Sequence, residues 1–128
     1  MFLFPNTVLL KKADFIISFG NSYNEMIPSK TLEIVGYRKP IVHFSQLESD
    51  ASELYLRDYP MWCNIFIGNV VKDNTWSKTH IDKIVKELAA FVKNNGHRIC
   101  EYNDVYQSYV KYTPEYFVKK ILGFVEKL

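Results

Sequence analysis

The amino-acid sequence predicts an α/β fold, an open sheet of about four parallel strands with helices on both faces. Short, continuous apolar runs recur along the chain, and such runs are typical of strands buried on both faces of a parallel sheet. Segments with apolar residues at helical spacing separate these runs. Residues 14–44 hold a strand, a loop, a helix and a second strand. Their length matches the ~30 residues of one β-α-β crossover.

The first predicted strand covers residues 14–19, where apolar and β-branched side chains run up to Gly20. Residues 8–12 before it have the pattern of a helix end. The polar segment 21–28 after it is rich in turn-forming residues and predicts a loop. This loop leaves the carboxyl end of a buried strand, where α/β proteins bind their ligands.

A short helix of about two turns follows the loop. Ser29 is a good N-cap residue and Gly36 a good C-cap residue, and the residues between them supply an apolar face. Residues 41–44 then form a second buried strand. The later elements alternate in the same way: a helix over 50–58, a strand over 63–67, a helix over roughly 76–94, a short strand over 97–101, a helix over 101–111, and a last helix capped by Thr113 that runs to the C-terminus.

This order of elements is that of a Rossmann-like open sheet. The 128 residues correspond to a single domain, residues 1–128, without an internal repeat or a linker. Hydrophobic residues make up 48% and charged residues 23%, as in ordinary globular proteins, which excludes a disordered or collagen-like chain.

Charge and targeting signals exclude further classes. Sixteen basic and fourteen acidic residues give a net charge of +2 without a Lys/Arg-rich block, so no nucleic acid is expected as a partner. The apolar start of the chain is interrupted by Pro5 and precedes Lys11 and Lys12, which is the reverse of a signal peptide. We therefore expect a cytoplasmic protein.

Several kinds of catalytic centre are also not expected. The three histidines are too scattered for a zinc site, so no metal is predicted. Cys63 and Cys100 lie in apolar stretches and are expected to be small buried hydrophobes rather than a disulfide. No Gly-x-Ser-x-Gly elbow, Walker loop or Gly-x-Gly-x-x-Gly motif is present, which argues against a hydrolase, an ATPase or a dinucleotide dehydrogenase.

The loop and the short helix after it have features of a nucleotide site. The loop begins with Asn21 and Ser22, which we include among the candidate binding residues. Unpaired backbone N–H groups where the helix opens at Ser29 favour an anion such as a phosphate. Lys30, in the first turn of the helix, is poorly placed for the helix dipole, which favours a role with phosphate.

Two acidic residues complete this candidate site. Glu25 lies in the loop, and Glu33 lies just past the first turn of the helix. A carboxylate at the position of Glu33 can accept hydrogen bonds from both hydroxyls of a ribose while the phosphates lie at the helix start. Both glutamates have an ordinary alternative, Glu33 as a solvated helix residue and Glu25 as a loop acid.

The same segment resembles a known enzyme family. Residues 25–33 keep the Glu, seven residues, Glu spacing of GT-B glycosyltransferases of family four, the group 1 glycosyl transferases. Residues 13–21 resemble the strand that precedes this motif in those enzymes. Residues 28–33 together with 36–42 resemble their PSK-x-x-E … G-x-x-KP-I-V segment. Over residues 45–128 only the order of elements agrees.

The resemblance implies the C-terminal, donor-binding half of a GT-B enzyme, and thus a fragment of a larger two-domain protein. Such an enzyme transfers a sugar from a nucleotide sugar, here a UDP- or GDP-sugar, to an acceptor and releases a nucleoside diphosphate, with retention of configuration. By resemblance, Glu33 would bind the ribose, Glu25 would lie near the transferred sugar as the catalytic residue, and backbone N–H groups near Ser29 and Lys30 would meet the diphosphate. The resemblance implies no further cofactor.

The chain departs from the family in two respects. Met26, Ile27 and Pro28 follow Glu25 where the family has small, Gly-rich residues, which puts Glu25 in doubt. The N-terminal acceptor-binding domain is missing, so it would be supplied by the full-length protein or by a separate subunit. We therefore expect this chain alone to be inactive, and membrane association through the full-length protein stays open. The alternatives are a non-catalytic α/β interaction module and half of a nucleotide-sugar epimerase.

Overall fold

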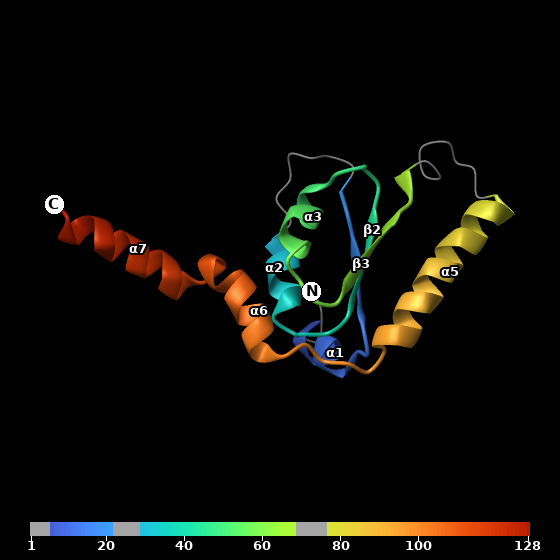
Figure 1. Cartoon of the computed structure of the whole chain (residues 1–128), viewed down its shortest axis with the longest axis horizontal. Coiled ribbons are helices and arrows are strands. Elements are labelled where there is room, and N and C mark those ends of the chain that lie inside the picture. The colour runs from blue at the N-terminus through green and yellow to red at the C-terminus, as the bar shows by residue number, and fades with distance from the viewer. Residues whose placement is uncertain (1–5, 22–28, 69–76) are drawn as a thin grey trace.

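Three parallel strands form the centre of the structure, a computed structural model that describes residues 6–21, 29–68 and 77–128 (Figure 1). β1 (Ile16–Phe19) pairs with β2 (Ile41–Ser45), and β2 pairs with β3 (Trp62–Phe66). The strand order β1-β2-β3 and the parallel pairing confirm the predicted α/β class and the β-α-β unit.

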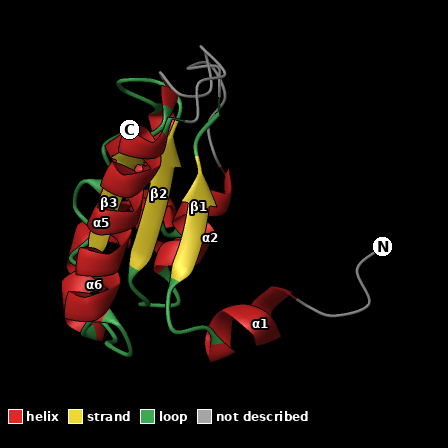
Figure 2. Cartoon of the chain, turned by 90° about the vertical axis from the view of Figure 1, so that its right-hand side faces the viewer, coloured by secondary structure: helices red, strands yellow, loops and turns green. Residues whose placement is uncertain are grey.

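Helices cover both faces of the sheet, as predicted. Figures 1 and 2 show α5 on one side of the strands and α2 on the other, with α3 and α6 on the side of α2. The helical elements are α1 (Asn6–Lys12), α2 (Ser29–Val35), α3 (Ala51–Leu56), α5 (Lys78–Asn95), α6 (Tyr102–Tyr109), the 3-10 helix η1 (Val110–Tyr112) and α7 (Pro114–Glu126).

The predicted fourth strand at 97–101 is wrong. In the part of the chain that the structure describes, the sheet has three strands, and residues 97–101 are irregular. The Cys100 N–H donates a hydrogen bond to the Arg38 carbonyl oxygen (2.8 Å), but a strand needs a ladder of such bonds. His97 also has a positive φ of 64°, which breaks the extended conformation at the start of the segment.

The main core lies between the sheet and the helices α2, α3 and α6. Ile16 and Ile41 lie side by side in the register of β1 and β2 and belong to this core together with Leu56 of α3. Successive side chains of a strand point to opposite faces. Ser18 and His43, two positions farther along the same register, therefore face the same helices, and this places polar groups at the carboxyl end of the core.

Sequence-local signals explain where the helices begin. Asp50 caps α3 by accepting a hydrogen bond from the Glu53 N–H (3.0 Å). Ser77 caps α5 through the His80 N–H, and Thr113 caps α7 through the Tyr116 N–H, with Pro114 in the first turn. The predicted starts of α3 and α7 are confirmed, and α5 begins at Lys78, two residues after the predicted position 76.

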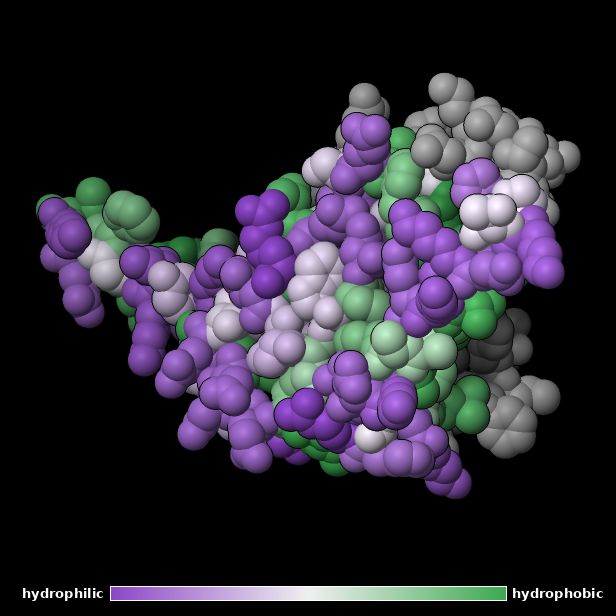
Figure 3. Space-filling model, turned by 45° about the vertical axis from the view of Figure 1, so that its right-hand side comes forward, coloured by the Kyte–Doolittle hydropathy of each residue, from purple (hydrophilic) through white to green (hydrophobic). Residues whose placement is uncertain are grey.

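The last helix extends away from the sheet (Figure 1). Its apolar side chains are solvent-exposed and appear green beside purple polar residues at the far end of the molecule in Figure 3. They are Phe117, Val118, Ile121, Leu122, Phe124 and Val125. No residue of α7 is buried against the rest of the described chain, so the packed core ends at α6.

Candidate functional site

The predicted site residues fall partly within the described structure. Asn21 is half-buried and directly follows Gly20 at the carboxyl end of β1. Ser29 is the first residue of α2, so the helix begins at the residue that the sequence predicts as its N-cap. Ser22 and Glu25 lie outside the described residues, so the predicted pair of glutamates is described only at Glu33.

Lys30 and Glu33 lie together on the exposed face of α2. Their side chains are 76% and 47% exposed, and the Lys30 Nζ lies 4.0 Å from the Glu33 Oε2. They line a shallow hollow of about 220 Å³ between α1 and α2. Leu9 and Leu10 of α1 and Ile34 of α2 supply its apolar wall.

This hollow combines three chemistries in a small space. Leucine and isoleucine side chains offer apolar contact to a flat ring, the carboxylate accepts hydrogen bonds from hydroxyls, and the ammonium group attracts an anion. Its volume is below the ~300–1,000 Å³ usual for drug-sized ligands. The hollow can therefore hold one part of a nucleotide, while the rest would extend beyond it.

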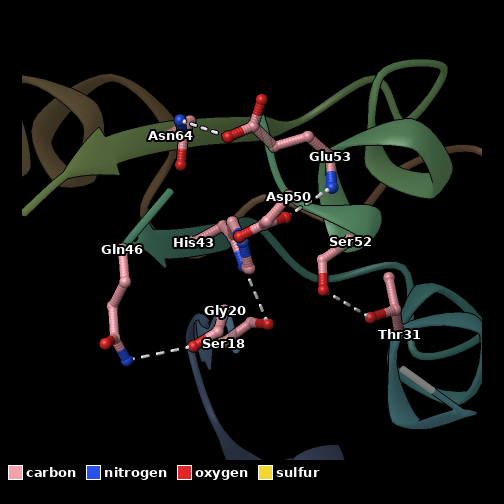
Figure 4. A network of polar contacts seen from close by, with 9 residues as sticks. All are labelled: Ser18, Gly20, Thr31, His43, Gln46, Asp50, Ser52, Glu53 and Asn64. Atoms are coloured by element: carbon pink, nitrogen blue, oxygen red, sulfur yellow. Dashed lines mark hydrogen bonds and ion pairs between the residues drawn. The ribbon is translucent and has the colours of Figure 1, made fainter. Parts of the chain in front are cut away.

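A second polar cluster lies at the carboxyl ends of the strands (Figure 4). The His43 Nε2 lies 2.9 Å from the Asp50 Oδ2, and the His43 Nδ1 lies 3.0 Å from the Ser18 Oγ. Both partners of the first contact are buried, with His43 0% and Asp50 3% exposed. The cluster joins β1, β2 and the start of α3 through side chains alone.

Gly20, the residue directly after β1, packs against this cluster. Gly20 donates its N–H to the Phe44 carbonyl (2.8 Å) and accepts a hydrogen bond from the Gln46 side-chain amide (3.3 Å). A Cβ at Gly20 would collide with a carboxylate oxygen of Asp50. Glycine is required here by close packing and not by backbone conformation, because its φ is not positive.

The cluster has the residue types of a nucleophilic triad but not the exposure of one. A nucleophile and its base must reach a substrate, and the imidazole of His43 has no exposed surface. Its two nitrogens are both engaged by protein groups. The arrangement is therefore suited to holding strand ends together.

The cluster was not predicted, because the sequence suggested a metal ligand as the only special role to consider for His43. Ser18 and His43 share one register position of β1 and β2, which becomes known only once the two strands are paired in the structure. Among the described residues, no group of three or more His, Cys, Asp or Glu side chains is arranged to hold a metal ion.

The cysteines are free, as predicted, with Cys100 buried and Cys63 half-buried. Burial and the negative charge of Glu87 raise the pKa of the Cys63 thiol to about 11, and burial also raises the pKa of Cys100. Neither thiol therefore has the lowered pKa of a catalytic cysteine.

We expect Cys63 to react with thiol reagents at pH 8 about 100-fold more slowly than an ordinary cysteine of pKa ~8.5, because so little of it is thiolate. The measurement is the rate of thiol labelling of the native chain between pH 7 and 10, with the urea-unfolded chain as the reference. Equal native and unfolded rates would contradict the shift.

Comparison of the sequence with protein families and curated proteins, and of the structure with solved structures, found no significant match. None of the described helices is both long and apolar enough to cross a bilayer.

Proposed function

We propose that this chain is the nucleotide-sugar donor-binding domain of a retaining glycosyltransferase. The observation that carries the proposal is the hollow in which Lys30 and Glu33 lie beside the leucines of α1. The parallel β1-α2-β2 unit also supports the proposal, because these three elements belong to the segment that resembles family-four enzymes.

In this proposal Glu33 accepts hydrogen bonds from the ribose hydroxyls, because its exposed carboxylate has Lys30 as its only ion-pair partner among the described residues. Lys30 then moves from Glu33 to the diphosphate, which its flexible, exposed side chain allows. The apolar wall of the hollow covers one side of the nucleoside. Glu25 stays the proposed residue nearest the transferred sugar.

The helix start is a minor part of the site. α2 has seven residues, and Ser29 and Lys30 stand in its first turn. Two turns give only a weak dipole, so the lysine charge supplies most of the attraction for the diphosphate. This differs from the expectation from the sequence, in which backbone N–H groups near Ser29 and Lys30 meet the diphosphate.

The proposed reaction needs a second domain that holds the acceptor. The departing nucleoside diphosphate is stabilised by this chain, while the acceptor hydroxyl comes from the N-terminal domain or a separate subunit. We propose that the enzyme acts in the cytoplasm. The chain alone binds the donor without transferring the sugar.

We expect the folded chain to bind UDP or GDP, and Glu33→Gln to weaken that binding about 10-fold, because a charged acceptor of two ribose hydroxyls becomes a neutral one. Ligand-observed NMR titration with UDP, GDP, ADP and CMP measures the affinity and identifies the base.

Glu115→Gln on α7 is the matched control, since it removes the same charge from a helix that does not line the hollow. Equal loss of affinity in both variants would mean that only overall charge matters. A folded wild-type chain that binds no nucleotide would contradict the proposed function and favour the interaction-module alternative.

A further inference from the structure

The buried contact between His43 and Asp50 lies where the ends of β1 and β2 meet the first turn of α3. The imidazole is fixed at both nitrogens, by Asp50 at 2.9 Å and by Ser18 at 3.0 Å. The second carboxylate oxygen of Asp50 accepts the Glu53 N–H at 3.0 Å. One short array thus ties three elements together (Figure 4).

Stability alone is a poor explanation for this array. Buried polar and charged groups lose hydration, and well-packed apolar residues of similar size are often as stable or more so. Such a network restricts the orientation of its side chains, because hydrogen bonds permit fewer arrangements than apolar contacts do. The residues on the same register nearer the start of the strands, Ile16 and Ile41, are apolar, so the polar groups are confined to the carboxyl end.

The array lies directly beside Gly20, the first residue after β1. The Asp50 carboxylate occupies the space that a side chain at position 20 would need, so Gly20 packs directly against it. The Gln46 amide and the Phe44 carbonyl hold the two polar groups of Gly20. Any displacement of Asp50 therefore changes the room available to Gly20 and to Asn21 after it.

We propose that the His43–Asp50 pair is a positioning device. It sets the conformation of the chain at Gly20 and at Asn21, a residue that the sequence predicts to bind the nucleotide, and thereby the affinity for the nucleotide. The identity of the ligand rests on the proposed function, whereas the positioning rests on the contacts described above. His43 and Asp50 are positioning residues that do not themselves touch the nucleotide.

The test is Asp50→Ser in the full chain. Serine is also a good N-cap, so the start of α3 is kept while the contact with His43 is lost. We expect UDP or GDP to bind at least 10-fold more weakly, and the backbone amide NMR signals of Gly20 and Asn21 to move, while signals from α7 stay in place.

Asp14→Ser is the matched control. Asp14 forms a second Asp–His pair, with His97 at 3.0 Å, but both side chains are mostly exposed. We expect this variant to keep the wild-type affinity and the wild-type Gly20 and Asn21 signals. A loss of affinity equal to that of Asp50→Ser would overturn the proposal.

Ser18→Ala keeps the proposal testable if Asp50→Ser does not fold. It removes the second anchor of the imidazole from a half-buried strand position, and we expect about 3-fold weaker binding with a smaller shift of the Gly20 signal. Unchanged affinity and unchanged Gly20 and Asn21 signals in the folded variants would show a purely structural role and overturn the inference.

Failure of the proposed function has a different signature, a wild-type chain that binds neither nucleotide. In that case the amide signals by themselves test whether the pair positions Gly20 and Asn21. Displaced Gly20 and Asn21 signals in Asp50→Ser, with Asp14→Ser unchanged, support it, and unmoved signals overturn it.

Discussion

Gly20→Ala is expected to destabilise the folded chain by about 3 kcal/mol, a large effect for one methyl group. The new Cβ would overlap the Asp50 carboxylate and approach the His43 Nε2 to 3.2 Å. Neither group can simply turn away, because Asp50 is also held by the Glu53 N–H and His43 by Ser18. The urea midpoint of unfolding, followed by circular dichroism, measures the loss.

Gly123→Ala is the control for this substitution. A Cβ at Gly123 meets no atom within 4 Å, and the residue lies inside α7, where alanine favours the helix by about 1 kcal/mol over glycine. We expect no loss of stability there. If Gly20→Ala unfolds at the wild-type urea concentration, the close packing of Gly20 against Asp50 is wrong.

The sequence predicted the elements whose signals are local. Thr113 followed by Pro114 predicts a helix start from the capping hydroxyl and the fixed φ of proline, and the structure has α7 begin there. The strand at residues 41–44 was recognisable because a central parallel strand is buried on both faces, as β2 is.

The one strand that was predicted wrongly depends on a contact between distant parts of the chain. The segment 97–101 has strand-like composition, but whether it becomes a strand depends on a free neighbour with which to form a ladder. Its one backbone bond of this kind is the Cys100 N–H to Arg38, 62 positions away. Composition carries no information about that distance in space.

The candidate site likewise has one part that follows from the local sequence and another that depends on tertiary packing. Lys30 and Glu33 are three residues apart on one helix, so their proximity follows from helical geometry. Their neighbours Leu9 and Leu10 come from α1 and were not predicted, because the packing of α1 against α2 is a tertiary property. The Ser18–His43–Asp50 array was missed for the same reason, since it depends on strand register.

Leu56→Ala is the second substitution with a large expected effect, a loss of about 3 kcal/mol in the free energy of unfolding. Leu56 is 0% exposed at the end of α3 and belongs to the core that includes Ile41 and Tyr109. Removing its side chain creates a cavity in that core, and a chain of this size has little stability to spare. Urea unfolding of both proteins gives the difference.

Leu54→Ala in the same helix is the control, which separates the effect of losing a buried side chain from the effect of changing the helix propensity. Leu54 is 53% exposed, so the same chemical change is made two residues away with little apolar surface lost. We expect a change within about 0.5 kcal/mol. The contrast between the two leucines tests whether α3 packs on the sheet by the face described, and this matters for the site because Asp50 begins that helix. Similar losses at both positions would mean that α3 is rotated, and the contact between Asp50 and His43 would then be misplaced as well.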